Sequence, residues 1–264
     1  MKNILASWPK LAGELAAGDP LLLGLDYDGT LAPIVRNPAD ARMSRATRAS
    51  LEKLCASPRL FAAVISGRTL ADIRQRMGIP NVIYGGNHGL ELSGPGWNYL
   101  NPCACKARNV LRETAKKLAE KLRGREGVIL EDKHLTLTVH FRKARETEES
   151  LIRAEVEEIL APFRARRQLR LTEGKKVLEI RPPTNWGKGN ALRLIQRRLA
   201  SRAKVARLRT LYIGDDRTDE AAFAALGKGD FSVRVGKNQA TAARWSLAGV
   251  GEVRKLLNRL ENCL

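Results

Sequence analysis

Short apolar runs alternate with helical patterns at both ends of this 264-residue chain. Apolar runs of about four to eight residues bounded by turn residues indicate buried strands, and apolar residues at helical spacing indicate helices. The alternation starts at residue 21 and returns over residues 183–262. It predicts a parallel sheet with helices on both faces. We expect strands at 21–25, 61–65, 82–84, 211–213 and 231–235, and helices at 44–56, 70–77 and 191–199.

The middle of the chain follows another pattern, which begins after the break at Gly94-Pro95-Gly96. Consecutive strands joined by short connections pair in antiparallel fashion. We therefore expect a core domain of residues 1–96 and 183–264 and an inserted α/β domain of residues 97–182 with an antiparallel sheet. The expected elements of the insertion are helices at 107–122 and 146–160 and strands at 128–131, 136–142, 170–172 and 177–181.

The chain is 44% hydrophobic, so it can bury a core, but its formal net charge is +19. This charge is spread as +3 over residues 1–100, +7 over 101–182 and +9 over 183–264. A basic chain can bind nucleic acid. The sequence has no basic low-complexity arm and no aromatic stacking motif. We therefore interpret the charge as a solvated surface that also attracts a dianionic substrate, and expect no nucleic-acid partner.

The sequence also bears on the compartment. It contains no run of about 18 apolar residues, which a membrane span needs, and its first residues lack the pattern of a signal peptide. The four cysteines do not form a disulfide framework. Cys103-Ala104-Cys105 is a single CxC with no second pair beside it, so we expect no zinc site there. We expect a cytoplasmic monomer with reduced thiols.

Two carboxylates follow the first predicted strand, in the run DYDGT at residues 26–30. Open α/β sheets bind ligands at the carboxyl ends of their strands. Asp26 and Asp28 at this spacing suit a hard cation and a nucleophilic oxygen together. The alternative is an ordinary acidic turn, because Asp-Gly is a common turn pair.

Further strand ends carry the groups that would complete such a site. The strand at 61–65 leads into Ser66, and the strand at 211–213 leads into an acidic run at 214–220. Lys188 precedes a helical pattern, where its charge would oppose the positive end of the helix unless it has a role. Carboxylates, a hydroxyl and a lysine are the parts of a magnesium-dependent phosphoryl-transfer site.

The order of these motifs resembles the haloacid dehalogenase (HAD) superfamily of phosphatases, and their detail resembles the trehalose-6-phosphate phosphatase family. The resemblance covers residues 20–240. It implies a Rossmann-like HAD core with a parallel sheet, and an inserted C2-type cap domain that closes over the active site. The segments that carry it are 25–34 and 212–220, which many phosphatases share, and the more specific 86–91, 131–133, 139–142 and 173–182.

The resemblance implies an enzyme that hydrolyses trehalose 6-phosphate to trehalose and inorganic phosphate, the last step of trehalose biosynthesis. It implies that Asp26 attacks phosphorus and forms an aspartyl-phosphate. Asp28 would protonate the leaving sugar oxygen and then deprotonate the attacking water. Ser66 would hydrogen-bond the phosphoryl group, and Lys188 would neutralise it.

The implied cofactor is Mg²⁺. Its implied ligands are Asp26, the backbone carbonyl of Asp28, and Asp215. Asp216 or Asp219 would hold a metal-bound water or orient Lys188. The sequence does not distinguish which of the two has which role.

Substrate contacts are expected from both domains. In the core they are Gly67, Arg68 and His88. In the insertion, the period-two pattern of residues 136–142 puts His140 and Arg142 on one strand face. In an ordinary sheet this face is solvated, whereas in a phosphatase cap it would contact the sugar. The candidates in the insertion are Glu131, Lys133, Arg142, Lys176 and Glu179.

Two of these candidates conflict with a single strand face. Lys176 and Glu179 are three residues apart, and they cannot share a face unless Lys176 lies in the preceding turn.

Other functions remain open. Within the enzyme class, the alternative is a HAD phosphatase for sucrose phosphate or glucosylglycerate phosphate, or a phosphomutase with the same first motif. Outside it, the alternative is a basic binding protein on a phosphatase scaffold. The complete set of Asp26, Asp28, Ser66, Lys188 and Asp215 argues against lost catalysis.

Overall fold

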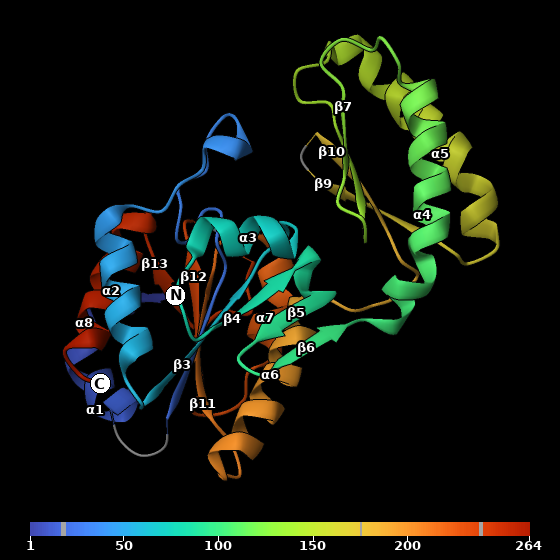
Figure 1. The fold of residues 1–264 in the computed structure, drawn as a ribbon. Coiled ribbons are helices and arrows are strands. Elements are labelled where there is room, and N and C mark those ends of the chain that lie inside the picture. The colour runs from blue at the N-terminus through green and yellow to red at the C-terminus, as the bar shows by residue number, and fades with distance from the viewer. Residues whose placement is uncertain (17–19, 175, 238–239) are drawn as a thin grey trace. The chain divides into compact units, whose positions relative to one another are not determined.

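The structure is a computed structural model of residues 1–264, and it describes all of them except 17–19, 175 and 238–239. The chain divides into two compact units (Figure 1). The first unit contains Met1–Tyr99 and Trp186–Leu264, and the second contains Leu100–Asn185. Both boundaries lie three residues further along the chain than those expected from the sequence.

The first unit is built on a mixed sheet with the strand order β1-β13-β12-β11-β2-β3-β4-β5-β6. The pairs from β1 to β4 are parallel, and β5 runs antiparallel to β4. Its strands are β1 Lys2–Asn3, β2 Leu21–Leu25, β3 Leu60–Ile65, β4 Val82–Gly86, β5 Glu91–Gly94, β6 Trp97–Leu100, β11 Arg209–Gly214, β12 Phe231–Val235 and β13 Trp245–Leu247. The predicted parallel sheet is confirmed.

Helices cover both faces of this sheet because its central strands are apolar on both sides. Leu21, Leu23 and Leu25 of β2 pack with one group of helices, whereas Leu22 packs with the other. Figure 1 shows α2 and α8 on one side of the sheet and α6 on the other. The first group is α1 Trp8–Ala16, α2 Arg45–Ala56, α3 Leu70–Met77 and α8 Val250–Glu261, and the second is α6 Lys188–Ala203 and α7 Glu220–Ala225.

The start of the predicted insertion is corrected by the sheet of the first unit. Residues 97–100 form β6, which belongs to this sheet and not to the inserted sheet. The break predicted at Gly94-Pro95-Gly96 is the turn between β5 and β6, where Gly96 has a φ of 81°. Glycine adopts this left-handed conformation without steric cost. The chain therefore pairs once more before it leaves the first unit.

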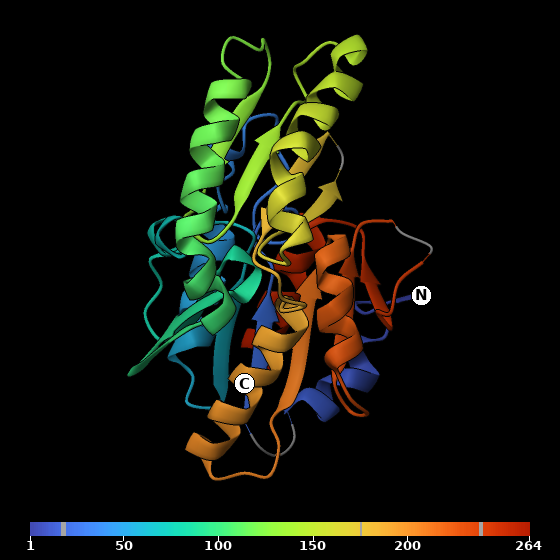
Figure 2. The same cartoon turned by 90° about the vertical axis from the view of Figure 1, so that its right-hand side faces the viewer.

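The second unit is a sheet in the order β7-β8-β10-β9 with antiparallel pairs, as predicted. Leu137, Val139, Leu178 and Ile180 point to the face that α4 and α5 cover. Figure 2 shows these helices, in green and yellow, side by side. The elements are α4 Pro102–Lys121, β7 Ile129–Asp132, β8 Leu137–His140, α5 Glu149–Ala165, β9 Arg170–Gly174 and β10 Val177–Arg181.

The strand predicted at 136–142 is shorter than expected. It begins at Leu137 and ends at His140, and Arg142 lies in a turn, so the expectation that Arg142 shares a strand face with His140 is wrong. The reason is the hydrogen bond from Ala144 N to the Phe141 carbonyl, which folds the chain back.

In the part of the chain that the structure describes, no helix has the length and apolar character of a membrane span.

The start of α6 packs closely against α7. A Cβ on Gly189 would lie 2.2 Å from the backbone oxygen of Ala221. Backbone atoms cannot move aside as the end of a side chain can. Only glycine therefore allows this approach, and Gly189 directly follows Lys188, the first residue of α6.

We predict that Gly189→Ala lowers the free energy of unfolding by about 1–3 kcal/mol, because the added methyl group overpacks this contact. Gly13→Ala in α1 is the matched control, since a Cβ there meets nothing within 4 Å. It should raise stability by about 0.5–1 kcal/mol through helix propensity. Urea unfolding measures both. Unchanged stability of Gly189→Ala would contradict the close contact of α6 and α7.

Candidate active site

The predicted catalytic residues come from strands that are neighbours in the sheet. Strands β11, β2 and β3 are adjacent and parallel, so the loops after them start at the same edge. Asp26 follows β2, Ser66 follows β3 and Asp215 follows β11. The backbone N–H of Asp26 donates to the carbonyl of Ile213 over 2.9 Å, so the pairing of β2 with β11 continues to the first residue after β2.

A buried lysine connects two of the carboxylates. The Nζ of Lys188 lies 2.7 Å from Oδ1 of Asp26 and 2.8 Å from Oδ1 of Asp219. Only 2% of the Lys188 side chain is exposed. The hydroxyl of Tyr212 also donates to Oδ1 of Asp219 over 2.7 Å. Asp219 is thus held by a lysine and a tyrosine, and it orients Lys188 toward Asp26.

Burial and charge determine the protonation of this cluster. Burial alone would lower the pKa of Lys188, but Asp219 and Asp26 outweigh it and raise that pKa. Burial raises the pKa of Asp26 well above its ordinary value, against the opposing charge of Lys188. Burial, together with the charge of Asp219, raises the pKa of Asp215 to about 6. The lysine therefore stays protonated among an excess of carboxylates, which is an environment that favours a further cation.

The carboxylates suit a metal ion. Oxygen atoms of Asp26, Asp215 and Asp219 lie within 4.8 Å of one another. Oδ1 of Asp215 is buried and has no hydrogen-bond partner among the described residues. A Cβ on Gly29 would lie 2.0 Å from Oδ2 of Asp215, so glycine lets this carboxylate approach the loop after β2. Carboxylate oxygens are ligands of hard divalent cations. The residues present therefore fit such a cation.

Ser66, Gly67 and His88 form one corner of the first unit. Ser66 is buried, its carbonyl accepts from the backbone N–H of His88 over 2.8 Å, and its Oγ accepts from the backbone N–H of Arg68 over 3.2 Å. A Cβ on Gly67 would lie 2.7 Å from the His88 ring, so the ring packs on this glycine. His88 has a φ of 57°. The structure thus brings Ser66, Gly67 and His88 close together, as a shared role in one binding site requires.

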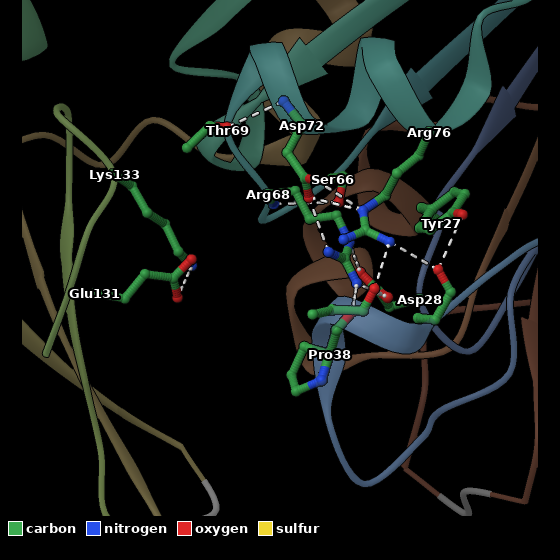
Figure 3. Close-up of polar contacts among 12 residues, drawn as sticks. Tyr27, Asp28, Pro38, Ser66, Arg68, Thr69, Asp72, Arg76, Glu131 and Lys133 are labelled. Atoms are coloured by element: carbon green, nitrogen blue, oxygen red, sulfur yellow. Dashed lines mark hydrogen bonds and ion pairs between the residues drawn. The ribbon is translucent and has the colours of Figure 1, made fainter. Parts of the chain in front are cut away.

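The side chains of Asp28 and Arg68 face each other (Figure 3). The guanidinium of Arg68 donates to both carboxylate oxygens of Asp28, over 2.7 and 2.6 Å. It also donates to Asp72 of α3 and to the backbone carbonyl of Pro38. Arg68, which was predicted to bind substrate, is thus paired with Asp28, which was predicted to transfer the proton.

In the second unit, a row of polar residues crosses the sheet on the face opposite to α4 and α5. Glu131, Thr138 and Glu179 are direct partners in the antiparallel register, so they share this face. Oε2 of Glu131 lies 3.0 Å from Nε2 of His140 and 3.5 Å from Nζ of Lys133. Oγ1 of Thr138 is buried without a hydrogen-bond partner among the described residues. The row combines carboxylates with an unused hydroxyl, which suits a polyhydroxylated ligand.

The remaining candidates of the second unit lie off this row. Lys176 occupies the turn between β9 and β10 with a φ of 60°, which resolves its conflict with Glu179. Its ammonium pairs with Glu149 of α5. Arg142 is exposed in the turn after β8.

Asp216 of the first unit is the other candidate for a metal-bound water. Its carboxylate accepts from the hydroxyl of Thr218 over 3.1 Å.

Some residues of the site carried no signal in the sequence. Tyr212 lies in the apolar strand β11, where it reads as an ordinary core residue. Arg234 had a usable signal, because a buried arginine is rare unless it is paired. It interrupts the apolar strand β12 and donates to the Asp216 carbonyl and to Glu220, each over 2.9 Å. It therefore supports the acidic loop after β11.

The chain is similar in sequence to known proteins. The trehalose-phosphatase family matches residues 24–250. Trehalose-phosphate phosphatase of Mycobacterium marinum (strain ATCC BAA-535 / M) is 38% identical over an alignment of 247 residues, and the match covers 90% of this chain and 61% of that protein. The chain thus spans about three fifths of the length of this curated relative.

Solved structures show the same fold. Trehalose-6-phosphate phosphatase of Aspergillus fumigatus, in crystal form 3, is 29% identical with a TM-score of 0.68 over 97% of both chains. A haloacid dehalogenase-like hydrolase from Bacteroides thetaiotaomicron is 16% identical with a TM-score of 0.62, over 92% of this chain and 100% of that one. The second likeness concerns the fold alone. The predicted HAD fold is confirmed.

We predict that Lys188→Met lowers the free energy of unfolding by about 3–5 kcal/mol in chelator, because it leaves two buried carboxylates without their cation. The variant Lys188→Met/Asp219→Asn should lose less, since it also removes one of these charges. Urea unfolding monitored by circular dichroism measures both. If Lys188→Met is as stable as the unaltered protein, the buried ion pairs are not formed as described.

Proposed function

Because the chain belongs to the trehalose-phosphatase family, we propose that it hydrolyses trehalose 6-phosphate to trehalose and inorganic phosphate, the last step of trehalose biosynthesis. The observation that carries this proposal is the buried Lys188 between Asp26 and Asp219, with Asp215 beside them, at the carboxyl edge of the sheet. A protonated lysine that touches a carboxylate suits a site that must stabilise a phosphoryl group next to an anionic nucleophile.

In the proposed first step, a carboxylate oxygen of Asp26 attacks phosphorus and the bond from phosphorus to the sugar oxygen breaks. Asp28 donates a proton to that oxygen, and trehalose leaves. In the second step, Asp28 takes a proton from water, whose oxygen attacks the aspartyl-phosphate. Phosphate leaves, and the Asp26 carboxylate is restored. Lys188 holds Oδ1 of Asp26 throughout and neutralises charge.

In this proposal the corner of Ser66, Gly67 and His88 receives the phosphoryl group. The support is its place after β3, next to the strand that carries Asp26. The Ser66 hydroxyl would donate to a phosphoryl oxygen. The His88 ring, packed on Gly67, would limit the space for the sugar oxygen.

We propose Mg²⁺ as the cofactor, held by Asp26, Asp215 and the backbone carbonyl of Asp28. The support is the set of oxygen donors, which suits a small hard cation. When bound, the ion would neutralise the phosphoryl oxygens. Asp219 is engaged by Lys188 and Tyr212, so we assign it to positioning Lys188 and leave Asp216 for a metal-bound water.

We propose that the polar row of the second unit binds the sugar. Glu131 and Glu179 would accept hydrogen bonds from sugar hydroxyls, and Thr138 offers an unused hydroxyl. Burial would raise the pKa of Glu131, but the hydrogen bond from His140 and the charge of Lys133 lower it, so this carboxylate stays an acceptor. Lys133, Arg142 and Lys176 remain candidates for contacts with hydroxyls or phosphate.

The proposal is tested by phosphate release from a panel of esters: trehalose 6-phosphate, sucrose 6-phosphate, glucosylglycerate phosphate and 4-nitrophenyl phosphate. We predict the highest kcat/KM for trehalose 6-phosphate. Asp26→Asn should lower it by roughly three orders of magnitude or more, because an amide lacks the anionic oxygen that attacks phosphorus. Asp132→Asn, at an exposed position of β7, is the matched control. Near-normal turnover by folded Asp26→Asn would exclude Asp26 as the nucleophile.

We also predict that activity disappears in excess chelator, returns with Mg²⁺ and is inhibited by Ca²⁺. Calcium takes about six to eight ligands at longer distances, so both oxygens of Asp26 would coordinate it and in-line attack would suffer. Titration of each ion into the chelator-treated protein measures this. Full activity in the chelator would contradict the proposed metal role of Asp26 and Asp215.

We predict that Glu131→Ala lowers kcat/KM for trehalose 6-phosphate by about tenfold or more but changes it little for 4-nitrophenyl phosphate. A lost hydrogen bond to a charged group costs about 1.5–3 kcal/mol. Glu126→Ala, an exposed glutamate of the same unit, is the control. Equal losses on both substrates would mean that Glu131 stabilises the second unit and does not bind sugar.

A further inference from the structure

The proposed proton donor, Asp28, is clamped by one guanidinium (Figure 3). Nε of Arg68 lies 2.7 Å from Oδ2 of Asp28, and Nη2 lies 2.6 Å from Oδ1. Two parallel bonds of this kind fix the plane of a carboxylate as well as its position. The side chain of Arg68 is only 11% exposed, so water competes little for these bonds.

The other donors of Arg68 are occupied too. Nη1 donates to Oδ2 of Asp72 over 2.8 Å, and Nη2 donates to the Pro38 carbonyl over 2.7 Å. At least four of the five N–H groups of this arginine are therefore used within the protein. The guanidinium also lies over the Tyr27 ring, 5.5 Å from its centre. Arg68 has little capacity left to bind a phosphate ester.

A second arginine braces the first through Asp72. Nε of Arg76 lies 2.9 Å from both carboxylate oxygens of Asp72. Asp72 and Arg76 are four residues apart on α3, so they share a helix face. Nη1 of Arg76 donates to the carbonyls of Ala39 and Ala41, over 3.2 and 2.9 Å. The brace thus joins α3 to the loop that follows the catalytic strand β2.

The charges of this network support one another. Burial alone would lower the pKa of Arg68 and raise that of Asp72. The hydrogen bonds that Arg68 donates to Asp28 and Asp72 outweigh burial and raise the pKa of Arg68 above its ordinary value. Hydrogen bonds from Arg76 and Arg68 likewise lower the pKa of Asp72. Both groups therefore remain charged, and the network persists at neutral pH.

We propose that Arg68 is a positioning residue for Asp28 and that the Asp72–Arg76 pair positions Arg68. The inference rests on the proposed function, because Arg68 would position the group that transfers the proton in that reaction. It differs from the sequence-based expectation, in which Arg68 binds substrate. A carboxylate has about four lone-pair sites, of which Arg68 uses two. Asp28 can therefore exchange a proton with the sugar oxygen or with water while the clamp holds it.

The test compares two leaving groups. Trehalose 6-phosphate loses an alcohol, which must be protonated, whereas 4-nitrophenyl phosphate loses a stable phenolate that needs no proton. The variants are Arg68→Lys, which keeps the charge but not the fork, Asp72→Asn and Arg76→Gln. Arg74→Gln is the matched control: it removes the same charge from α3, but Arg74 reaches Ser93 Oγ over 3.4 Å instead of the network. Single-turnover experiments measure the rate of leaving-group release, and steady-state experiments measure kcat, KM and inhibition by inorganic phosphate.

Correct positioning of a general acid is worth on the order of 10²–10⁴-fold. We expect Asp72→Asn and Arg68→Lys to slow the release of trehalose by roughly tenfold or more, with KM and phosphate inhibition within about twofold. Release of nitrophenolate should stay near the rate of the unaltered protein. Arg76→Gln should show the same selectivity with a smaller loss, and Arg74→Gln should show none.

Other outcomes overturn the inference in distinguishable ways. A raised KM and weaker phosphate inhibition in Arg68→Lys, with kcat unchanged, would make Arg68 a phosphate ligand. Equal losses on both substrates would mean that the network only supports the fold. If Asp72→Asn does not fold, Arg76→Gln decides between these results. If the unaltered protein releases phosphate from no ester, the proposed function fails and this inference fails with it.

Discussion

The site depends on one buried ammonium group. Lys188 lies between Asp26 and Asp219, where it is almost completely removed from water. Burying a charge costs several kcal/mol unless partners compensate for it. The two carboxylates compensate for the lysine, and Tyr212 adds a hydrogen bond to Asp219. Asp215 adds a third carboxyl group to this cluster, and its buried Oδ1 has no hydrogen-bond partner among the described residues. Three carboxyl groups thus lie near a single ammonium group, and their oxygen atoms fit a further hard cation.

Two glycines and the order of the strands allow these charged side chains to lie so close together. Lys188 is the first residue of α6, and the next residue is a glycine that lets α6 meet the backbone of α7. Gly29 similarly lets Asp215 lie against the loop after β2. A Cβ on Gly189 would collide with the backbone of Ala221, and a Cβ on Gly29 would displace the Asp215 carboxylate. The parallel order of β11, β2 and β3 brings the loops together, and the glycines allow the final approach.

The two carboxylates of the DYDGT motif are held in different ways. Asp26 is buried and paired with a lysine, in an environment that raises its pKa. The Asp28 side chain is more exposed and is clamped by Arg68, which is itself braced from α3. In the proposed mechanism, Asp26 must face phosphorus as the nucleophile, whereas Asp28 must be held near the leaving oxygen as the proton donor. The different surroundings of these neighbouring residues suit that division of labour.

The sequence alone determined the central strands, the helices between them and the order of the catalytic motifs. These follow from local patterns: apolar periodicity marks the strands, and each motif stands directly after a strand. The same locality limited the prediction. Strand β6 pairs with β5 directly before it, and the strand through Val139 ends at the turn that Ala144 and Phe141 close. Apolar periodicity marks a strand, but it does not specify which strands pair or where a turn ends one of them.

Tertiary structure alone decided which polar groups meet. It placed Lys176 in a turn beside Glu149, engaged Arg68 with Asp28, and brought Tyr212 to Asp219. A tyrosine in an apolar strand looks the same in sequence whether its hydroxyl meets water or a buried carboxylate. The hydrogen bonds and charges that define the site act over about 3 Å, and only the folded chain brings residues from different strands and helices within that distance.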